Sequence, residues 1–346
     1  MQNPTMSDDS AGAKPAPNDA QRPLVSMLLI AYKQEDVVAD AVRGALAQTY
    51  TPLEILISDD CSPDRTFDAI TQAVNGYQGP HRIVLNRNEH NEGIAAHLSK
   101  LALMSRGDLL VVAAGDDISL PNRCSRLVDV WLAHGRKPDL IASDLIELGA
   151  SGPTRAQLSP TDLGAYQGIE DWLAQRPHLI GASHAWSRRL FDRFGAMLRG
   201  TMAEDQIMTF RAIMSGGAIS VREPLVMYRR GGLSGKRRAK SVDEFVARVK
   251  QTNQFALAEV AQLLRDAETA GVYPRMHDAL APKQARENYT RDVFAAGSLS
   301  ARIRLMAKAT RVKLGFRIRM FLYAACPAFY APIFALKRWR AHARSS

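Results

Sequence analysis

The sequence predicts an α/β fold in which a mostly parallel sheet is flanked by helices, and two observations carry this prediction. Short apolar or β-branched runs occur at residues 24–31, 53–58, 83–85 and 109–113, and helical patterns separate them. Regular alternation of strands and helices is typical of a parallel sheet with right-handed crossovers. The run at 109–113 lacks polar alternation, as expected for a strand that is buried on both faces.

The elements follow in order. Apolar residues within 35–48 form one stripe that predicts a helix over this segment, and Pro52 lies just beyond the end of the helix. Ser62 followed by Pro63 predicts the start of a helix that covers 64–74. A third helix should precede Gly107, which ends it. Further helices are expected at 121–135, around 169–175, over a stretch that carries Leu190 and Phe194, and from about 201. Strands are expected at 140–148, 185–187 and 218–228, with a polar loop at 149–170.

The distribution of charge and the number of cysteines indicate where the basic residues lie and which cellular compartment is expected. The chain has 346 residues and a formal charge of +10, but eleven Lys or Arg and no Asp or Glu follow residue 300. The first 300 residues are therefore close to neutral, and the basic character belongs to the C-terminus. Cys61, Cys124 and Cys326 match neither a metal-ligand pattern nor a disulfide framework, which favours the cytoplasm. Residues 1–22 lack the features of a secretory signal and are expected to be disordered.

Pairs of carboxylates follow two of the predicted strands. Asp59 and Asp60 come directly after 53–58, and Asp116 and Asp117 follow 109–113. Open α/β sheets bind ligands at the carboxyl ends of their strands, so these residues are candidate site residues. A surface turn or helix capping would explain either pair alone. The first strand is followed by AYKQED instead of a glycine-rich turn, which argues against a dinucleotide-binding domain.

Two later clusters add to these pairs. Glu204 and Asp205 lie at the start of a predicted helix, where acidic residues also serve as capping groups. Residues 229–238 contain five cations and three glycines, which suits a loop that closes over phosphates as well as an ordinary solvated loop.

Taken together, these segments resemble family 2 glycosyltransferases with the GT-A fold, over about residues 24–235. The matching stretches are VSMLLIAYKQEDVVADAVRGALAQTYTPLEILISDDCSPDRT, NEHNEGIAAHLSKLALMSRGDLLVVAAGDD, AEDQIMTFR and MYRRGGLSG, in the family's order.

The resemblance implies a role for each cluster. Asp59 or Asp60 would hold the nucleoside of a sugar nucleotide, and Asp116 and Asp117 would bind Mg²⁺ or Mn²⁺, with Asp117 as the preferred direct ligand. Asp205 would be the catalytic base with Glu204 in support, and Arg229 or Arg230 would contact the leaving diphosphate. The other donor-binding residues would be Ala31, Tyr32, Glu35, Asn91 and Gly93.

Two positions depart from the family pattern. Ala114 stands where the family often has an acid, two residues before the Asp pair, and a His that is frequent after the Tyr-Arg is missing. The chemistry of the remaining residues still agrees with the family, because one or two carboxylates suffice to hold Mg²⁺ or Mn²⁺ against substrate phosphates. A carboxylate on the opposite side can take the proton from an acceptor hydroxyl, and a single displacement inverts the anomeric carbon.

The expected function is therefore an inverting glycosyltransferase that moves a sugar from a nucleotide-sugar donor to a hydroxyl of a glycan or lipid-linked glycan in bacterial surface polysaccharide synthesis. Two alternatives remain. A metal-dependent nucleotidyl or phosphoryl transferase would also use acids at strand ends, and a non-catalytic sugar-nucleotide-binding protein would tolerate Ala114.

The chain divides into a catalytic domain at 23–238, a helical extension at 239–300 and a basic tail at 301–346. In the tail, an apolar stripe flanked by cations suits a helix on an anionic membrane; it comprises Leu305, Ala309, Val312, Phe316 and Met320. Residues 320–336 are uncharged but short for a span and contain two prolines, which favours a re-entrant or interfacial hairpin. A peripheral place on the inner face of the cell membrane is expected. The alternatives are a helix docked on the protein's own core and a nucleic-acid-binding tail, which the apolar content disfavours.

Overall fold

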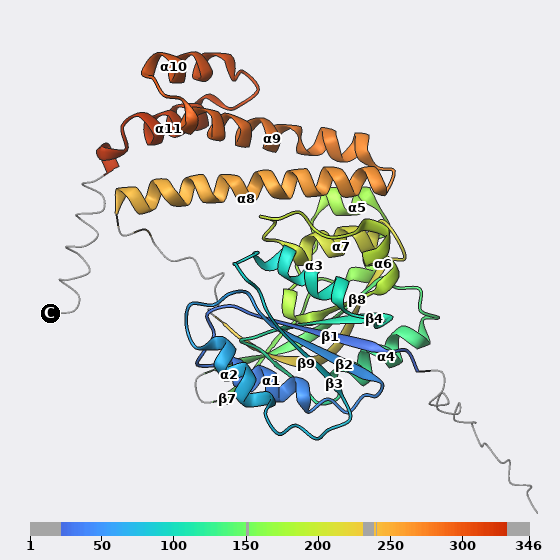
Figure 1. Ribbon diagram of the computed structural model, residues 1–346. Coiled ribbons are helices and arrows are strands. Elements are labelled where there is room, and N and C mark those ends of the chain that lie inside the picture. Colours follow the sequence, from blue (N-terminus) through green and yellow to red (C-terminus); the bar gives the residue numbers. More distant parts are fainter. Residues whose placement is uncertain (1–21, 150–151, 231–238, 240, 331–346) are drawn as a thin grey trace, which may run out of the picture.

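The computed structural model describes residues 22–149, 152–230, 239 and 241–330 (Figure 1). Within these residues, nine strands form one sheet. They are β1 (Val25–Ala31), β2 (Leu53–Asp59), β3 (Arg82–Arg87), β4 (Leu109–Ala114), β5 (Ile118–Ser119), β6 (Leu140–Gly149), β7 (Gly152–Leu158), β8 (His184–Ser187) and β9 (Ala218–Arg229). The four N-terminal strands pair in parallel in the order β3-β2-β1-β4, as the sequence predicts.

The second half of the sheet is mixed. β8 runs antiparallel between β4 and β6, and β9 pairs in parallel with β6. β5 pairs antiparallel with β9, and β7 pairs antiparallel with β6. The sheet is therefore mostly parallel where the candidate site lies, and it reverses direction beyond β4.

Helices cover both faces of the sheet and continue into a C-terminal extension (Figure 1). They are α1 (Val38–Leu46), α2 (Thr66–Val74), α3 (Ile94–Met104), α4 (Arg123–Ala133), α5 (Ile169–Ala174), α6 (Arg188–Phe194), α7 (Glu204–Ile213), α8 (Val242–Thr269), α9 (Tyr273–Ala295), α10 (Leu299–Lys308) and α11 (Leu314–Ala325), with short 3₁₀ helices η2 (Leu163–Ala165), η3 (Gly181–Ser183) and η4 (Pro327–Tyr330). One core packs α1, α2 and α4 on the sheet, and a second packs α3, α6 and α7 on the other face.

Two local predictions are wrong. The predicted loop at 149–170 contains β7 and η2; β7 is mostly exposed and pairs only with β6, so it carries no hydrophobic pattern that would reveal it. α2 begins at Thr66 without a side-chain cap. Ser62 does not cap it, because its backbone N–H and hydroxyl both donate to Asp59.

The C-terminal extension begins with a pair of long helices, α8 and α9, within the segment 239–300 where helices were predicted. Near the α8–α9 turn the two helices pack against the catalytic domain, through the buried residues Val260, Leu263, Ala267, Met276 and Leu280. Figure 1 shows the other end of the pair extending beyond the domain, where α10 and α11 lie on α9.

The apolar stripe of the tail has a different role from the predicted one. It is divided between two helices, because the chain leaves helical geometry between Lys308 and Leu314. Its members pack with Tyr289 and Val293 of α9, and Val312 and Met320 are buried there. The stripe is therefore largely covered by protein, as expected for the alternative of a helix docked on the protein's own core. Among the described residues no helix is long and apolar enough to span a bilayer, and the rest of the predicted hairpin, residues 331–336, lies outside them.

Candidate active site

The strand ends bring the predicted carboxylates to one edge of the sheet. Ala31 pairs in register with Asp59, and Ile30 pairs with Ala114. The backbone N–H of Asp60 donates to the carbonyl of Ala31 at 2.9 Å, and the N–H of Gly115 donates to that of Ile30 at 2.9 Å. The ends of β1, β2 and β4 therefore form one continuous platform.

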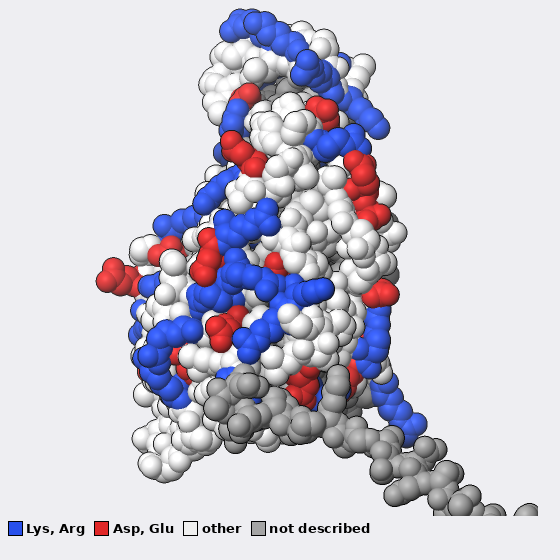
Figure 2. All heavy atoms as spheres, turned by 90° about the vertical axis from the view of Figure 1, so that its right-hand side faces the viewer, with Lys and Arg blue, Asp and Glu red and all other residues white. Residues whose placement is uncertain are grey.

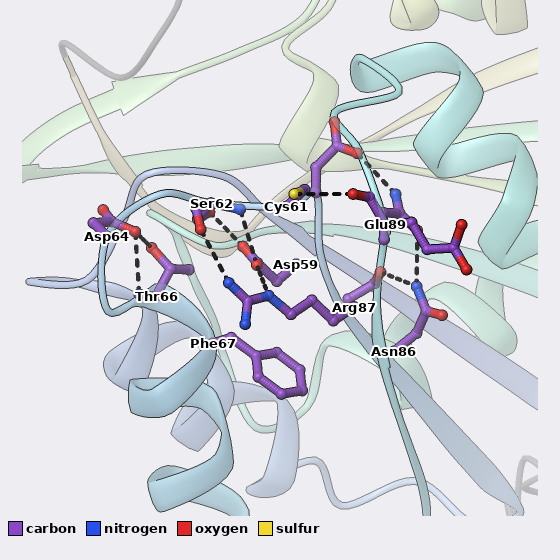
Figure 3. Close-up of polar contacts among 12 residues, drawn as sticks. Asp59, Cys61, Ser62, Asp64, Thr66, Phe67, Asn86, Arg87 and Glu89 are labelled. Atoms are coloured by element: carbon purple, nitrogen blue, oxygen red, sulfur yellow. Dashed lines mark hydrogen bonds and ion pairs between the residues drawn. The ribbon is translucent and has the colours of Figure 1, made fainter.

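Asp59 lies inside a network that holds the loop after β2 (Figure 3). Its carboxylate is completely buried and accepts hydrogen bonds from the backbone and hydroxyl of Ser62. Arg87 of β3 approaches the same carboxylate at 3.4 Å and stacks over the ring of Phe67, 5.3 Å from its centroid. These partners account for both oxygens of Asp59.

Asp60 organises the loop that precedes α3. Its Oδ2 accepts from the N–H of Gly93 at 2.9 Å, and its Oδ1 accepts from the N–H of Glu92 at 2.9 Å and from Asn88 at 2.8 Å. The side chain of Asn91 donates to the carbonyl of Asp60 at 3.2 Å. Gly93 has φ of +79°, a conformation that favours glycine. The structure thus brings together Asp60, Asn91 and Gly93, which the sequence placed in one donor-binding set.

The turn after β1 is fixed by Gln34, which the sequence prediction missed. Its Oε1 accepts from the N–H of Tyr32 at 3.2 Å, and its own N–H donates to Thr66 at 2.8 Å. Glu35 lies on the exposed side of this turn, where Oε2 accepts from the N–H of Arg65 at 2.9 Å. A single glutamine in a polar turn forms no pattern, so no sequence signal pointed to it.

The turn after β4 packs closely on the end of β1. A Cβ added to Gly115 would lie 2.4 Å from Oε1 of Gln34 and 2.8 Å from Cβ of Ala31. Glycine is therefore required at this position, and it fixes Asp116 and Asp117 immediately beside the turn that carries Tyr32.

Asp117 is buried, Asp116 is half-buried, and the pKa values of both are raised. Burial and the neighbouring Asp116 raise the pKa of Asp117 to about 7, against the opposing hydrogen bond from the N–H of Arg229 at 2.8 Å. Burial also raises the pKa of Asp116, against a hydrogen bond from Gln34 and the charge of Arg229. Two adjacent carboxylates whose negative charge is poorly solvated are suited to a divalent cation.

The described residues contain no group of three or more His, Cys, Asp or Glu placed to hold a metal ion. Ala114 contributes no carboxylate, and it packs instead against a small apolar cluster that includes Ala182 and Tyr228. Protein ligands from the Asp pair alone would leave several coordination positions to phosphate oxygens and water, which is how Mg²⁺ is usually held.

The two arginines at the end of β9 diverge. Nε of Arg229 donates to the carbonyl of Asp116 at 3.2 Å, and its guanidinium lies 3.7 Å from Asp40. Arg230 instead pairs with Glu147 at 2.9 Å. The structure therefore brings only Arg229 to the Asp pair. Residues 231–238 of the predicted basic loop lie outside the described residues.

Glu204 and Asp205 occupy the first turn of α7, and both lie in a buried environment. Burial, and then the charge of Asp205, raise the pKa of Glu204 to about 8. Burial also raises the pKa of Asp205, against a hydrogen bond from the N–H of Gln206 at 2.7 Å and the charge of His178. The raised pKa favours the protonated form of Glu204 at neutral pH.

A buried arginine connects the two groups of acids. Arg123 is completely buried and donates to the carbonyls of Val112 at 2.8 Å and Ala182 at 2.7 Å, and to the hydroxyl of Ser119 at 2.9 Å. Ala182 follows Gly181, where an added Cβ would lie 2.7 Å from Oε1 of Glu204. Arg123 thus ties β4 and β5, which flank the Asp pair, to the segment that covers Glu204. Its position within an ordinary amphipathic helix gave no sequence signal.

Comparison with known proteins gives a consistent result. Residues 26–190 match the description "Glycosyl transferase family 2". The succinoglycan biosynthesis protein ExoO of Rhizobium meliloti is 28% identical over 271 residues, which cover 72% of this chain and 74% of ExoO. The putative glycosyltransferase EpsE of Bacillus subtilis is 28% identical over 139 residues, 40% of this chain and 49% of EpsE. This last match thus spans about half of the relative's length.

The chain is also similar in sequence to a second named transferase and in fold to a solved structure. The Escherichia coli β-1,3-glucosyltransferase WfaP, whose name gives UDP-Glc as donor and α-D-GlcNAc-diphosphoundecaprenol as acceptor, is 30% identical over 105 residues, 30% of this chain and 40% of WfaP. Among solved structures, S. aureus TarS 1-349 in complex with UDP-GlcNAc superimposes with a TM-score of 0.52 at 14% identity, covering 86% of this chain and 88% of that chain. The likeness to TarS concerns the fold alone.

Proposed function

Since this chain is a family 2 glycosyltransferase, we propose that it transfers a sugar, with inversion, from a nucleotide-sugar donor to a hydroxyl of a glycan or lipid-linked glycan. The observation that carries the proposal is the position of Asp116 and Asp117, which lie just after β4 with Arg229 against them. This is the edge of the sheet where parallel α/β folds bind their ligands.

The donor diphosphate lies, in this proposal, between the Asp pair and Arg229. Asp117 and Asp116 would hold Mg²⁺ or Mn²⁺, and a bound ion would supply positive charge to the departing diphosphate. Arg229 adds a second positive charge from β9. The nucleoside lies beside Tyr32 and the loop that Asp60 organises, because both are on the same platform.

Asp205 is proposed as the base that takes the proton from the acceptor hydroxyl. Burial raises its pKa toward the range in which a carboxylate is an effective base. Glu204 supports it as a neutral neighbour. Arg123 keeps this pair and the Asp116 turn in one arrangement through its bonds to Val112 and Ala182.

The acceptor and the location are proposals from the relatives and from charge. ExoO is named for succinoglycan biosynthesis, and the name of WfaP describes an acceptor linked to diphosphoundecaprenol. An acceptor of this kind is embedded in a membrane, and the eleven cations after residue 300 would attract an anionic leaflet. We therefore infer a peripheral location on the inner face of the cell membrane.

The test is an assay of the full-length protein with a panel of sugar nucleotides, with and without Mn²⁺, in which donor binding is followed by thermal shift. Release of nucleoside diphosphate in step with glycosylation of an acceptor supports the proposal. Release of pyrophosphate indicates a nucleotidyl transferase, and donor binding without any turnover indicates a non-catalytic binding protein. Asp205→Asn should bind donor and lose transfer, and near-normal transfer by this variant would show that Asp205 is not the base.

A further inference from the structure

The C-terminal helices expose large apolar side chains over more than a third of the surface of each. On α11, Leu314, Ile318 and Leu322 expose 57%, 42% and 38% of their surface. On α10, Leu299 and Ile303 expose 56% and 48%. Because residues four apart lie on the same side of a helix, each helix presents one outward apolar face. We call these five residues the outer face.

This outer face differs from the stripe that the periodicity of the sequence singled out. Val312 and Met320 are buried against α9, and Phe316 packs with them. The C-terminal unit therefore has an inner apolar side that completes the protein and an outer apolar side that remains open. An exposed apolar group of this kind, rimmed by polar residues, is typical of an interaction site.

The rim of the outer face is positively charged. Exposed cations lie next to the outer face in the sequence, on α10, on α11 and on the link between them: Arg304, Lys308, Arg311, Lys313 and Arg319. No Asp or Glu occurs anywhere after Asp292, and Asp292 pairs with Arg291 at 2.9 Å. Figure 2 shows Lys and Arg gathered across the top of the molecule, over these helices.

We propose that the outer face of α10 and α11 binds the surface of an anionic lipid bilayer, with its leucine and isoleucine side chains entering the headgroup region. A helix that lies in this interface buries its apolar face among the acyl chains and places its cations near the lipid phosphates. The inference rests on the membrane location proposed above and names the surface responsible. A second copy of the chain is a poorer occupant, because it would bring the same rim of cations against the first.

The position of the outer face also fits the proposed reaction. α10 and α11 lie on α9 at the end of the α8–α9 pair that extends away from the sheet (Figure 1). The buried contacts of Val260 and Met276 attach the other end of the pair to the catalytic domain. The pair is therefore an attached spacer, and binding at its far end would hold the catalytic domain near the bilayer.

The test compares three full-length proteins by sedimentation with vesicles: the wild type, the triple variant Leu314→Ser, Ile318→Ser and Leu322→Ser, and the control Leu103→Ser. Leu103 is 68% exposed on α3, far along the chain from the tail, so it matches the chemistry of the change. Vesicles contain either phosphatidylcholine alone or phosphatidylcholine with phosphatidylglycerol. We expect the wild type and the control to bind the anionic vesicles preferentially, and the triple variant to bind at least about tenfold more weakly.

Each other outcome has a distinct meaning. Equal binding by the triple variant and the wild type would overturn the assignment of the outer face. Failure of the wild type to bind anionic vesicles would overturn the membrane location as well, whereas glycosyl transfer to a soluble acceptor is measured separately and tests the proposed function alone. If the triple variant instead dissociates an oligomer in light scattering while vesicle binding is unchanged, the occupant is a second copy. Unchanged thermal unfolding of the triple variant shows that its fold is intact.

Discussion

The backbone N–H of Arg229 donates to Oδ1 of Asp117 at 2.8 Å, and this bond joins the end of β9 to the turn after β4. The side chain of Arg229 continues to the carbonyl of Asp116 at 3.2 Å. A cation is therefore held directly at the acids proposed to face the donor diphosphate, whereas the adjacent Arg230 pairs with Glu147.

This divergence predicts unequal effects of two similar substitutions. Arg229→Ala should lower kcat/KM for the donor by about a hundredfold, because it removes a charge aimed at the leaving group. Arg230→Ala is the matched control and should change kcat/KM by less than about threefold, since its ion pair is largely exposed. The measurement is steady-state release of nucleoside diphosphate. Equal losses in the two variants would contradict the assignment of Arg229 to the diphosphate.

The sequence predicted the platform because topology dictates it. Parallel strands that alternate with helices end at one edge, so Asp60 and Asp117 were expected at the same edge of the sheet once the strands were identified. The sequence could not predict which of Arg229 and Arg230 contacts the Asp pair. Successive side chains along a strand point to opposite faces, and the pairing of β9 with β5 sets which arginine is on the side of the Asp pair.

Long-range partners were also beyond prediction. Asp59 is engaged by Arg87 from another strand, and Arg123 bonds to carbonyls of β4 and η3. Periodicity likewise revealed an apolar stripe in the tail but not what covers it, and α9 proved to be the partner of Val312 and Met320. Sequence patterns locate apolar and charged positions, whereas tertiary packing decides what each contacts.

The buried pair on α7 predicts a characteristic dependence of stability on pH. The pKa of Glu204 is raised from an ordinary value of 4.5 to about 8, so between these values the unfolded chain releases a proton that the folded protein retains. The free energy of unfolding of the wild type should therefore fall as pH rises through this window. Glu204→Gln cannot ionise, so its free energy of unfolding should fall less steeply, by a few kcal/mol at most across the window.

Denaturant unfolding at pH 5, 6, 7 and 8 measures the effect. Glu268→Gln, an exposed position on α8, is the matched control and should keep the slope of the wild type. If Glu204→Gln also keeps that slope, Glu204 is not protonated in the folded protein and cannot be the neutral neighbour of Asp205.

The buried guanidinium of Arg123 predicts a structural and a kinetic effect. Arg123→Met removes donors to the carbonyls of Val112 and Ala182 and to the hydroxyl of Ser119, and should destabilise the protein by about 2–4 kcal/mol. Arg123→Lys retains the charge but not the planar fork, and should recover part of the stability. Because Arg123 ties together the segments that flank Asp117 and Glu204, both variants should lower kcat more than they raise KM. A purely structural role would lower stability and leave kcat of the folded fraction unchanged.

Ala114 provides the most direct test of how the Asp pair holds a cation. It packs against Ala182 and Tyr228, and the two acids that follow it already have raised pKa values because of burial. In the absence of metal, Ala114→Asp adds a third carboxylate to this region and should lower the free energy of unfolding by about 1–3 kcal/mol. In the presence of Mn²⁺ the added ligand should strengthen ion binding, so the rise in Tm on adding Mn²⁺ should exceed that of the wild type.

Asp117→Asn removes the proposed direct ligand, and its Tm should not respond to Mn²⁺. If all three proteins show the same rise in Tm, the ion binds elsewhere, and the carboxylates at the end of β4 contact the donor without it.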